Sequence, residues 1–243
     1  MRVGLISDVH GNAIALDAVL ADMAGKHVDE LVCLGDVATL GPSPSDVLQR
    51  LMRAGCPCVR GNHDLFLLQP ELIHTYTEAE VVVQSVAWCR EGLTADECAF
   101  LASMKDRWDV ELAEGVRLAA FHGTPHSTMH AILATTPASE VDEAFAGVDA
   151  AVVACGHSHV QMMRQHRGSL IVNPGSVGMP FKEHFTGGIP TVLRHAEYAT
   201  VDAHDGKIDV TLHRVPIDVE GVRRAILACT GPNQDGMLRP YVD

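Results

Sequence analysis

The sequence predicts an α/β protein that begins with a parallel sheet, and two observations lead to this prediction. Short apolar runs alternate with segments of helical periodicity over the first 60 residues, in the order β-α-β-α-β. Polar residues directly follow each apolar run, and ligand sites of parallel sheets lie at the carboxyl ends of the strands. The chain has 243 residues, 47% of them hydrophobic, which suffices for one large core. We therefore expect a single domain over residues 1–243.

The N-terminal third alternates predicted strands and helices. A helix follows the first strand because apolar residues recur there with a helical period. A second helix begins after a loop rich in Gly and Pro, with Ser45 as its expected cap. The predicted strands cover 3–7, 30–34 and 57–60, and the predicted helices cover 12–26 and 45–54.

Residues 65–106 have a helical pattern and few candidate ligands. One helix is expected over 77–90, and another begins at Thr94, where Glu97 has the spacing of a capping box. We interpret 65–106 as a helical insertion that shapes a substrate cleft. The same apolar segment could equally form a dimer surface, so the sequence leaves a homo-oligomer open.

The remaining sequence alternates further strands, helices and loops. A hairpin is expected across Asp205-Gly206, a favourable turn pair, and Asp218 is expected to cap the last helix. The tail over 231–243 shows no periodicity, so we expect it to lack regular structure. The predicted strands are 108–112, 116–121, 150–155, 160–165, 169–172, 195–204 and 207–215, the predicted helices are 137–147 and 219–229, and 178–190 is predicted as a loop near the site.

The charge balance and the cysteines restrict the function classes. The net charge of −13 disfavours polymeric nucleic acid as a partner, but a small phosphorylated substrate stays compatible, because bound cations reverse the local potential. No apolar run of about 18 residues and no signal peptide are found, so we expect no membrane partner. The seven cysteines are odd in number and form no C-x-x-C motif, which favours free thiols and a cytoplasmic location.

Polar clusters follow the predicted strands. Asp8 and His10 are two residues apart and project to the same side of an extended chain. The stretch Gly61-Asn62-His63-Asp64 could alone be a turn, because Gly, Asn and Asp are turn formers. His126 and His130 are four apart but lie in a loop, so they are secondary candidates. The complete set is Asp8, His10, Asp36, Asn62, His63, His122, His157 and His159.

This set indicates a metal centre. Two carboxylates, one amide and five imidazoles offer nitrogen and oxygen ligands without thiolates, which suits Mn, Fe, Zn, Co or Ni. Eight such residues are too many for one tetrahedral ion. They suit two divalent ions about 3.5–4 Å apart that share a carboxylate.

The clusters resemble the blocks of the calcineurin-like metallophosphoesterase superfamily. Those blocks read D-x-H, G-D, G-N-H-[DE], H and G-H-x-H, and all five occur here in this order across residues 8–159. The stretches His122-Gly123-Thr124-Pro125 and Asn173-Pro174-Gly175-Ser176 are similar to the small bacterial phosphodiesterase branch. The resemblance implies a four-layer α/β/β/α sandwich of two mixed sheets.

The resemblance also implies residue roles. One ion, most favourably Mn²⁺, would be held by Asp8, His10 and His159, the other by Asn62, His122 and His157, with Asp36 shared. His63 would bind no metal and would act on the leaving group as a general acid or charge stabiliser, while a hydroxide held between the ions attacks phosphorus. The expected substrates are small phosphodiesters or phosphomonoesters, nucleotide-like in type. The loop positions of His126, Phe181, Lys182 and His184 suggest substrate contacts.

One departure and one alternative complete the interpretation. Protein phosphatases of the superfamily carry Asp-Arg-Gly after the G-D block, whereas Val37-Ala38-Thr39-Leu40 follows Asp36 here. The usual carboxylate partner of the catalytic histidine therefore has no match, and the residue that orients His63 stays open. The alternative function is a non-catalytic scaffold of the same fold. A nuclease is disfavoured by the acidic charge.

Overall fold

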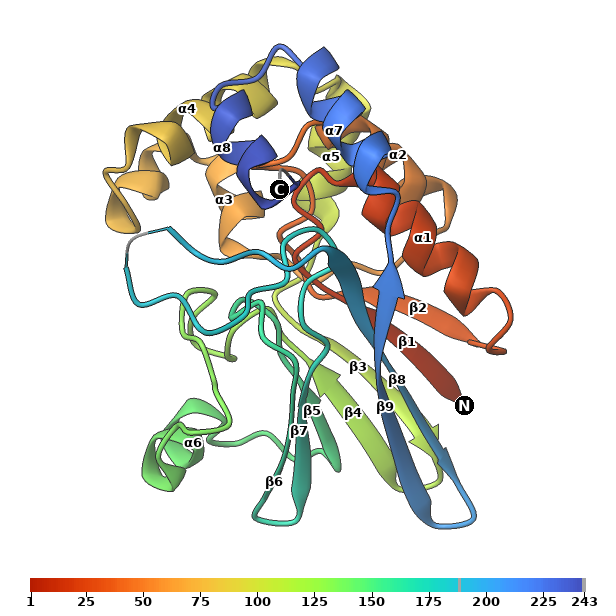
Figure 1. The fold of residues 1–243 in the computed structure, drawn as a ribbon. Coiled ribbons are helices and arrows are strands. Elements are labelled where there is room, and N and C mark those ends of the chain that lie inside the picture. Colours follow the sequence, from red (N-terminus) through yellow and green to blue (C-terminus); the bar gives the residue numbers. More distant parts are fainter. Residues whose placement is uncertain (188, 242–243) are drawn as a thin grey trace.

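Two mixed β-sheets pack face to face between helices, which gives the four-layer α/β/β/α sandwich (Figure 1). The structure is a computed structural model and describes residues 1–187 and 189–241. Apolar side chains from both sheets fill the space between them, among them Leu5, Val32, Leu118 and Val152. Both sheets alternate buried positions with positions that face the outer helices, as layered packing requires.

The first sheet has the order β2-β1-β8-β9. Strand β1 (Arg2–Ile6) is parallel to β2 (Glu30–Cys33) and antiparallel to β8 (His195–His204), which pairs with β9 (Lys207–Pro216). The β8–β9 hairpin turns at Asp205 and Gly206, with φ of 49° and 73°. Positive φ at both central residues is what a tight hairpin turn demands, so this prediction is confirmed.

The second sheet has the order β3-β4-β5-β7-β6. Its three central strands β4, β5 and β7 are parallel, and an antiparallel strand flanks them on each side. Strand β5 is short and buried on both faces, as expected for the middle of a layered protein. The bounds are β3 Trp108–Ala113, β4 Val116–Ala120, β5 Val152–Ala154, β6 Met162–His166 and β7 Ser169–Asn173.

The two helical layers are unequal. Most helices cover the outer face of the first sheet, where their apolar residues share one core cluster, whereas α6 (Ala138–Ala144) alone packs on the second sheet (Figure 1). None of the described helices has the length and hydropathy needed to cross a membrane. The large layer contains α1 Ala13–Met23, α2 Pro44–Arg53, α3 Asn62–Leu68, η1 Pro70–Thr75, α4 Glu80–Glu91, α5 Ala95–Ser103 and α7 Val219–Ala228.

Two predicted helix starts are confirmed and one is wrong. Thr94 and Glu97 form the capping box of α5, and Asp218 accepts the Gly221 N–H at the start of α7. Helix α2 begins at Pro44 after Ser43, not after Ser45. Proline favours the first helical position because its missing N–H would be unpaired there anyway.

The predicted strand over 57–60 is also corrected. The segment forms only isolated bridges, Cys33 with Cys58 and Val59 with Lys105. It lies between the edge of β2 and Lys105 and makes two backbone hydrogen bonds to each side, to Cys33 and to Lys105. Pairing stops there because the chain turns into α3 at Asn62. The segment still delivers the Asn62–His63 pair to the edge of the first sheet.

The C-terminal tail differs most from the expectation. It folds into α8 (Gln234–Leu238) and η2 (Arg239–Tyr241). Tyr241 is buried against Val222 and Ile226 of α7, and that burial orders a segment too short to show periodicity. All seven cysteines are free thiols, as predicted.

Candidate metal centre

The candidate ligands gather where four strand ends meet. Asp8 follows β1, Asp36 follows β2, His122 follows β4 and His157 follows β5, each within three residues of the last strand position. Both sheets therefore deliver polar side chains to one edge of the sandwich. Asn62 and His63 join them from the first turn of α3. All of these side chains except His157 are buried.

Backbone strain concentrates at the same residues. Asp8, His10, Asp36, His157 and His159 have φ of 53°, 44°, 57°, 63° and 56°. The left-handed region costs an L-residue roughly 1–2 kcal/mol, and such strain persists only where surrounding contacts enforce it. Five strained residues in one place indicate that the fold holds these side chains in a required arrangement.

Asp8, His10 and His159 form the first ligand group. One ligand atom from each lies within 4.8 Å of the others. His10 Nε2 is 3.2 Å from His159 Nε2, which in turn is 3.3 Å from Asp8 Oδ1. Two nitrogens that bind one ion at about 2.1 Å stand roughly 3.3 Å apart in a tetrahedral site. The group thus has the spacing of a cation site.

Asp36, His122 and His157 form the second group, again with ligand atoms within 4.8 Å of one another. His122 Nε2 lies 3.1 Å from Asn62 Oδ1 and 3.4 Å from Asp36 Oδ2. Asp36 Oδ2 is also 3.8 Å from His10 Nε2 of the first group. Asp36 therefore stands between the two groups, where a shared carboxylate belongs.

Hydrogen bonds orient two of the imidazoles. His122 Nδ1 lies 2.7 Å from the Leu34 carbonyl oxygen, and His159 Nδ1 lies 2.7 Å from that of Met179. An Nδ1–H that donates to a carbonyl fixes the ring and turns Nε2 toward the centre. Burial lowers the pKa of His10 to about 3 and that of His157 to about 4. These two rings are neutral and have a lone pair for a metal.

The two buried carboxylates, Asp8 and Asp36, favour positive charge beside them. Burial opposes a charge on His122, but Asp36 outweighs burial and raises the pKa of His122 to about 10. Burial alone would raise the pKa of Asp8, yet the neighbouring His159 lowers it to about 2. Asp8 Oδ1 is buried without a hydrogen-bond partner among the described residues. An orphan acceptor in a nitrogen- and oxygen-rich cluster fits divalent cations.

His63 lies beside this cluster, and its orienting partner is Thr39. Thr39 Oγ1 is 2.8 Å from His63 Nδ1, and both residues are buried. The His63 backbone N–H donates to Asp36 Oδ1 at 2.8 Å. The ring stands edge-on to His10, with 5.2 Å between centroids. The sequence offered one signal for Thr39, its place three residues after Asp36 where the phosphatase carboxylate has no match.

Asp64 does not reach His63 and serves the backbone instead. Its carboxylate accepts N–H groups from Gly61 and Asp36 at 2.8 Å each and from Val37 at 3.1 Å. Burial and the Asp36 charge raise the pKa of Asp64 to about 6. Asp64 thus joins the two blocks that supply Asp36 and His63.

The stretch 173–176 stabilises the backbone around the candidate metal ligands through hydrogen bonds. Asn173 Nδ2 donates to the Gly156 carbonyl at 2.8 Å, and Ser176 Oγ donates to the Asp8 carbonyl at 2.6 Å. Gly156 has no room for a side chain, since a Cβ would stand 2.0 Å from Ser7 Oγ. These contacts tie the residues around His157 to those around Asp8.

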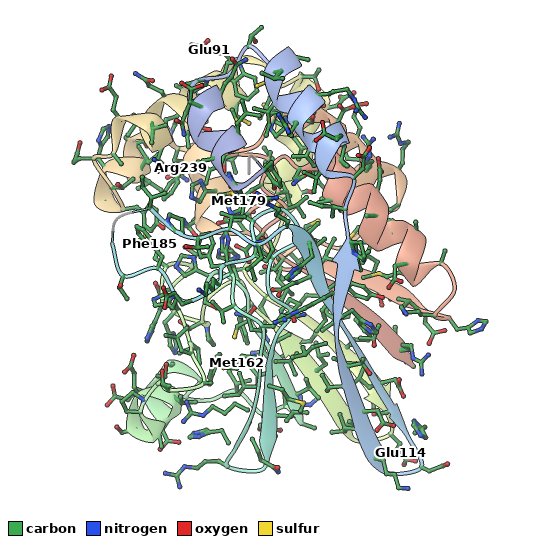
Figure 2. The ribbon with its side chains drawn as sticks, in the orientation of Figure 1. Glu91, Glu114, Met162, Met179, Phe185 and Arg239 are labelled. Carbon is green, nitrogen blue, oxygen red and sulfur yellow. The ribbon has the colours of Figure 1, made fainter. Side chains whose placement is uncertain are left out.

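A cleft of about 1380 Å³ opens above the centre, with His10, Asp36, His63, His157 and His159 on its floor. Figure 2 labels Met179, Phe185 and Arg239 of this cleft, which lie between the helical layer and the strands. Phe181 and His184 line it as well. His126 and Lys182 are exposed and do not line it, and His130 pairs with Glu140 at 3.0 Å.

Comparisons with known proteins find relatives that cover most of the chain. The chain is 27% identical over 234 residues to an uncharacterized protein of Methanocaldococcus jannaschii, covering 90% of this chain and 88% of the relative. A metallophosphoesterase structure from Sphaerobacter thermophilus has a TM-score of 0.75 at 25% identity and full coverage of both chains. A hypothetical protein of Pyrococcus horikoshii has a TM-score of 0.81 at 18% identity, covering 99% of this chain and 97% of that one.

The family model of the calcineurin-like phosphoesterase superfamily domain matches residues 1–204, which include every candidate ligand and His63. The match ends in β8, so β9, α7 and the folded tail lie beyond it. With two mixed sheets and the ligand cluster at their common edge, the chain belongs to the calcineurin-like phosphoesterase superfamily.

Proposed function

We propose that this protein is a phosphoesterase that uses two divalent cations to hydrolyse small phosphodiesters or phosphomonoesters of nucleotide size. The observation that carries the proposal is the position of Asp36 Oδ2, 3.4 Å from His122 Nε2 in one ligand group and 3.8 Å from His10 Nε2 in the other. A carboxylate shared between two nitrogen-rich groups is the arrangement that paired ions require.

Seven residues would hold the ions. Asp8, His10 and His159 would bind one and Asn62, His122 and His157 the other, with Asp36 shared. Nitrogen and oxygen donors without thiolates accept Mn, Fe, Zn, Co or Ni, and of these we propose Mn²⁺; the free thiols favour a cytoplasmic setting. When bound, the ions would supply Lewis-acid stabilisation of phosphoryl charge and a water of lowered pKa. The buried, oriented imidazoles keep this arrangement fixed while substrate enters from the cleft.

His63 would stabilise the negative charge of the leaving group. Burial lowers the pKa of His63, so the ring is neutral near pH 7. The Thr39 hydroxyl, 2.8 Å from Nδ1, can donate to that nitrogen, which leaves the ring proton on Nε2. Since His63 lines the cleft, its Nε2–H can donate a hydrogen bond to the negative charge that develops on a departing alkoxide or phenoxide, which stabilises that charge while the proton stays on the ring.

The first test is hydrolysis of p-nitrophenyl phosphate and bis-p-nitrophenyl phosphate by metal-stripped protein with Mn²⁺ added back. We expect Mn²⁺-dependent release of p-nitrophenol, and faster release from one ester identifies the monoesterase or diesterase preference. No release with Mn²⁺, Co²⁺, Ni²⁺ or Zn²⁺ would contradict the proposal and support a metal-binding scaffold instead.

A further inference from the structure

The cleft is larger than a phosphate group needs. Its volume of about 1380 Å³ exceeds the roughly 300–1,000 Å³ of pockets that enclose drug-sized ligands. The candidate metal centre occupies only its floor. The remaining space therefore belongs to the organic part of a substrate, and the side chains that line it indicate which organic parts fit.

Exposed apolar side chains gather in this cleft. Among the described residues, nine large hydrophobic side chains are exposed, and five of the nine line the cleft. A concentration of exposed apolar groups at one concave site marks a binding surface. The five come from four separate segments of the chain, and they are Tyr76, Val81, Met129, Phe185 and Ile189.

Aromatic rings contact two histidines of the site, His159 and His63. The Phe181 ring stacks on the His159 ring, with 4.3 Å between centroids and an interplanar angle of 19°. The Tyr76 ring meets the His63 ring edge-on at 6.0 Å. The organic group on either ester oxygen of a bound substrate would therefore lie against one of these two aromatic rings. Flat aromatic groups gain most from such surroundings through offset stacking and edge contacts.

Three polar side chains of the cleft wall make hydrogen bonds to the protein backbone. Ser85 Oγ accepts the Leu40 N–H at 3.1 Å, and Thr77 Oγ1 accepts the Ala79 N–H at 3.0 Å. Arg194 Nε donates to the Pro240 carbonyl at 2.7 Å. A hydroxyl-rich organic group would have to compete with these existing hydrogen bonds at the three side chains.

From these observations we propose that the cleft selects phosphoesters whose organic group carries a flat aromatic ring. Tyr76 and Phe185 would be its specificity-determining residues. The inference rests on the proposed phosphoesterase function, but it concerns recognition and can fail or hold separately. Aryl esters and nucleoside esters share this chemistry, and the experiment distinguishes them.

A series of phosphodiesters with one constant leaving group tests the proposal. Each compound carries p-nitrophenol, and the second ester is methyl, 2,3-dihydroxypropyl, cyclohexylmethyl, 2-naphthylmethyl or thymidin-5′-yl. We expect kcat/KM for the naphthylmethyl ester to exceed that for the methyl ester about 10-fold or more, as burial of roughly 60 Å² of apolar surface would give. The dihydroxypropyl ester should stay near the methyl ester. The faster of the thymidinyl and naphthylmethyl esters identifies a nucleoside or an aryl substrate.

Variants and a binding measurement make the result decisive. Phe185→Ala and Tyr76→Leu should reduce the naphthylmethyl-to-methyl ratio at least about threefold, and Tyr76→Leu separates a ring effect from an apolar one. Met163→Ala is the matched control, because Met163 is 55% exposed on β6 and does not line the cleft. Its ratio should equal that of the unaltered protein.

Calorimetric titration with 2-naphthylmethylphosphonate and methylphosphonate, with and without Mn²⁺, gives the readout that needs no turnover. Tighter binding of the naphthyl compound that Phe185→Ala weakens would support the proposal even if no ester were hydrolysed, and only the phosphoesterase function would then be refuted. Equal affinities for the two phosphonates would overturn the inference, whatever the turnover.

Discussion

The floor and the walls of the cleft are built on opposite principles. The floor, taken together with the candidate metal centre beneath it, consists of polar groups such as Asp8 and Asp36, which are 0% and 1% exposed. The walls consist of apolar groups such as Phe185 and Ile189, which are 42% and 71% exposed. Burial fixes the floor, whereas few contacts fix the walls. We infer that catalysis and substrate selection depend on different parts of this protein: catalysis on the buried polar groups, and substrate selection on the exposed apolar groups.

The floor and the walls also differ in the conformational free energy that their arrangement costs. At the floor, five residues hold left-handed backbone angles, and several carboxylates and imidazoles share a small volume. At the walls, none of the five exposed apolar side chains belongs to a residue with a left-handed backbone angle, and their exposure to water costs little beyond the apolar area. Substitutions at the floor should therefore remove activity, and substitutions at the walls should redirect it.

The largest effect is expected for Asp36→Asn at the floor. Both ligand groups would lose their shared carboxylate, so we expect phosphoesterase activity to fall about 10³-fold or more and the metal content to drop below two ions per chain. Activity assays and elemental analysis of the purified protein measure both quantities. Asp149→Asn is the control, because the Asp149 side chain is 95% exposed and, among the described residues, pairs with Arg117 alone.

A result in which Asp36→Asn keeps two ions per chain would contradict the shared-carboxylate assignment. A protein that loses activity but keeps its metals would instead place Asp36 among the substrate contacts. Circular dichroism shows whether the variant is folded before either conclusion is drawn.

The second-largest effect is expected for His63→Ala, which distinguishes metal binding from stabilisation of the leaving group. His63→Ala should retain both metals, because His63 belongs to neither ligand group. Turnover should fall roughly 10²–10³-fold, the range that one hydrogen-bond donor to a developing negative charge contributes. Substrates with better leaving groups should lose less, since a p-nitrophenolate needs less help from a hydrogen-bond donor than an alkoxide. Equal losses for both kinds of ester would remove the leaving-group role from His63.

The floor was predictable from the sequence because strand ends converge. Asp8, Asp36, His122 and His157 each stand just after an apolar run, and parallel strands of one layer end at the same edge. Local pattern was therefore enough to collect the ligand candidates. The left-handed angles of Asp8, Asp36 and His157 were not predictable, because they result from contacts across both sheets and from no local signal.

The walls were predictable only in outline. The loop over 178–190 was expected near the site, but the helical tail and buried Tyr241 were not. Tyr241 meets α7 and Asn12, and Thr39 meets His63 from 24 positions away. Such contacts depend on how distant segments pack, and neither hydrophobic period nor turn chemistry encodes them.

A smaller effect is expected where floor and wall meet, at Thr39. Thr39→Val removes the hydroxyl 2.8 Å from His63 Nδ1 with little change in volume. We expect kcat to fall about 10-fold with little change in KM, because a misoriented hydrogen-bond donor harms the transition state rather than substrate binding. Thr39→Ser should restore most of the activity. Failure of the serine variant to do so would make Thr39 a packing residue only.

The smallest effect on turnover is expected at the outer wall, for Tyr241→Ala. Loss of this buried ring should reduce the free energy of unfolding by about 2–3 kcal/mol, because the tail packs on α7 largely through it. Tyr241→Phe keeps the ring, so denaturant unfolding of the two variants separates packing from the hydroxyl. KM for aromatic esters should rise a few-fold in the alanine variant, since Tyr241 lines the cleft. If the alanine variant unfolds like the unaltered protein, the tail contributes nothing to stability, and the wall at α7 depends on the helix alone.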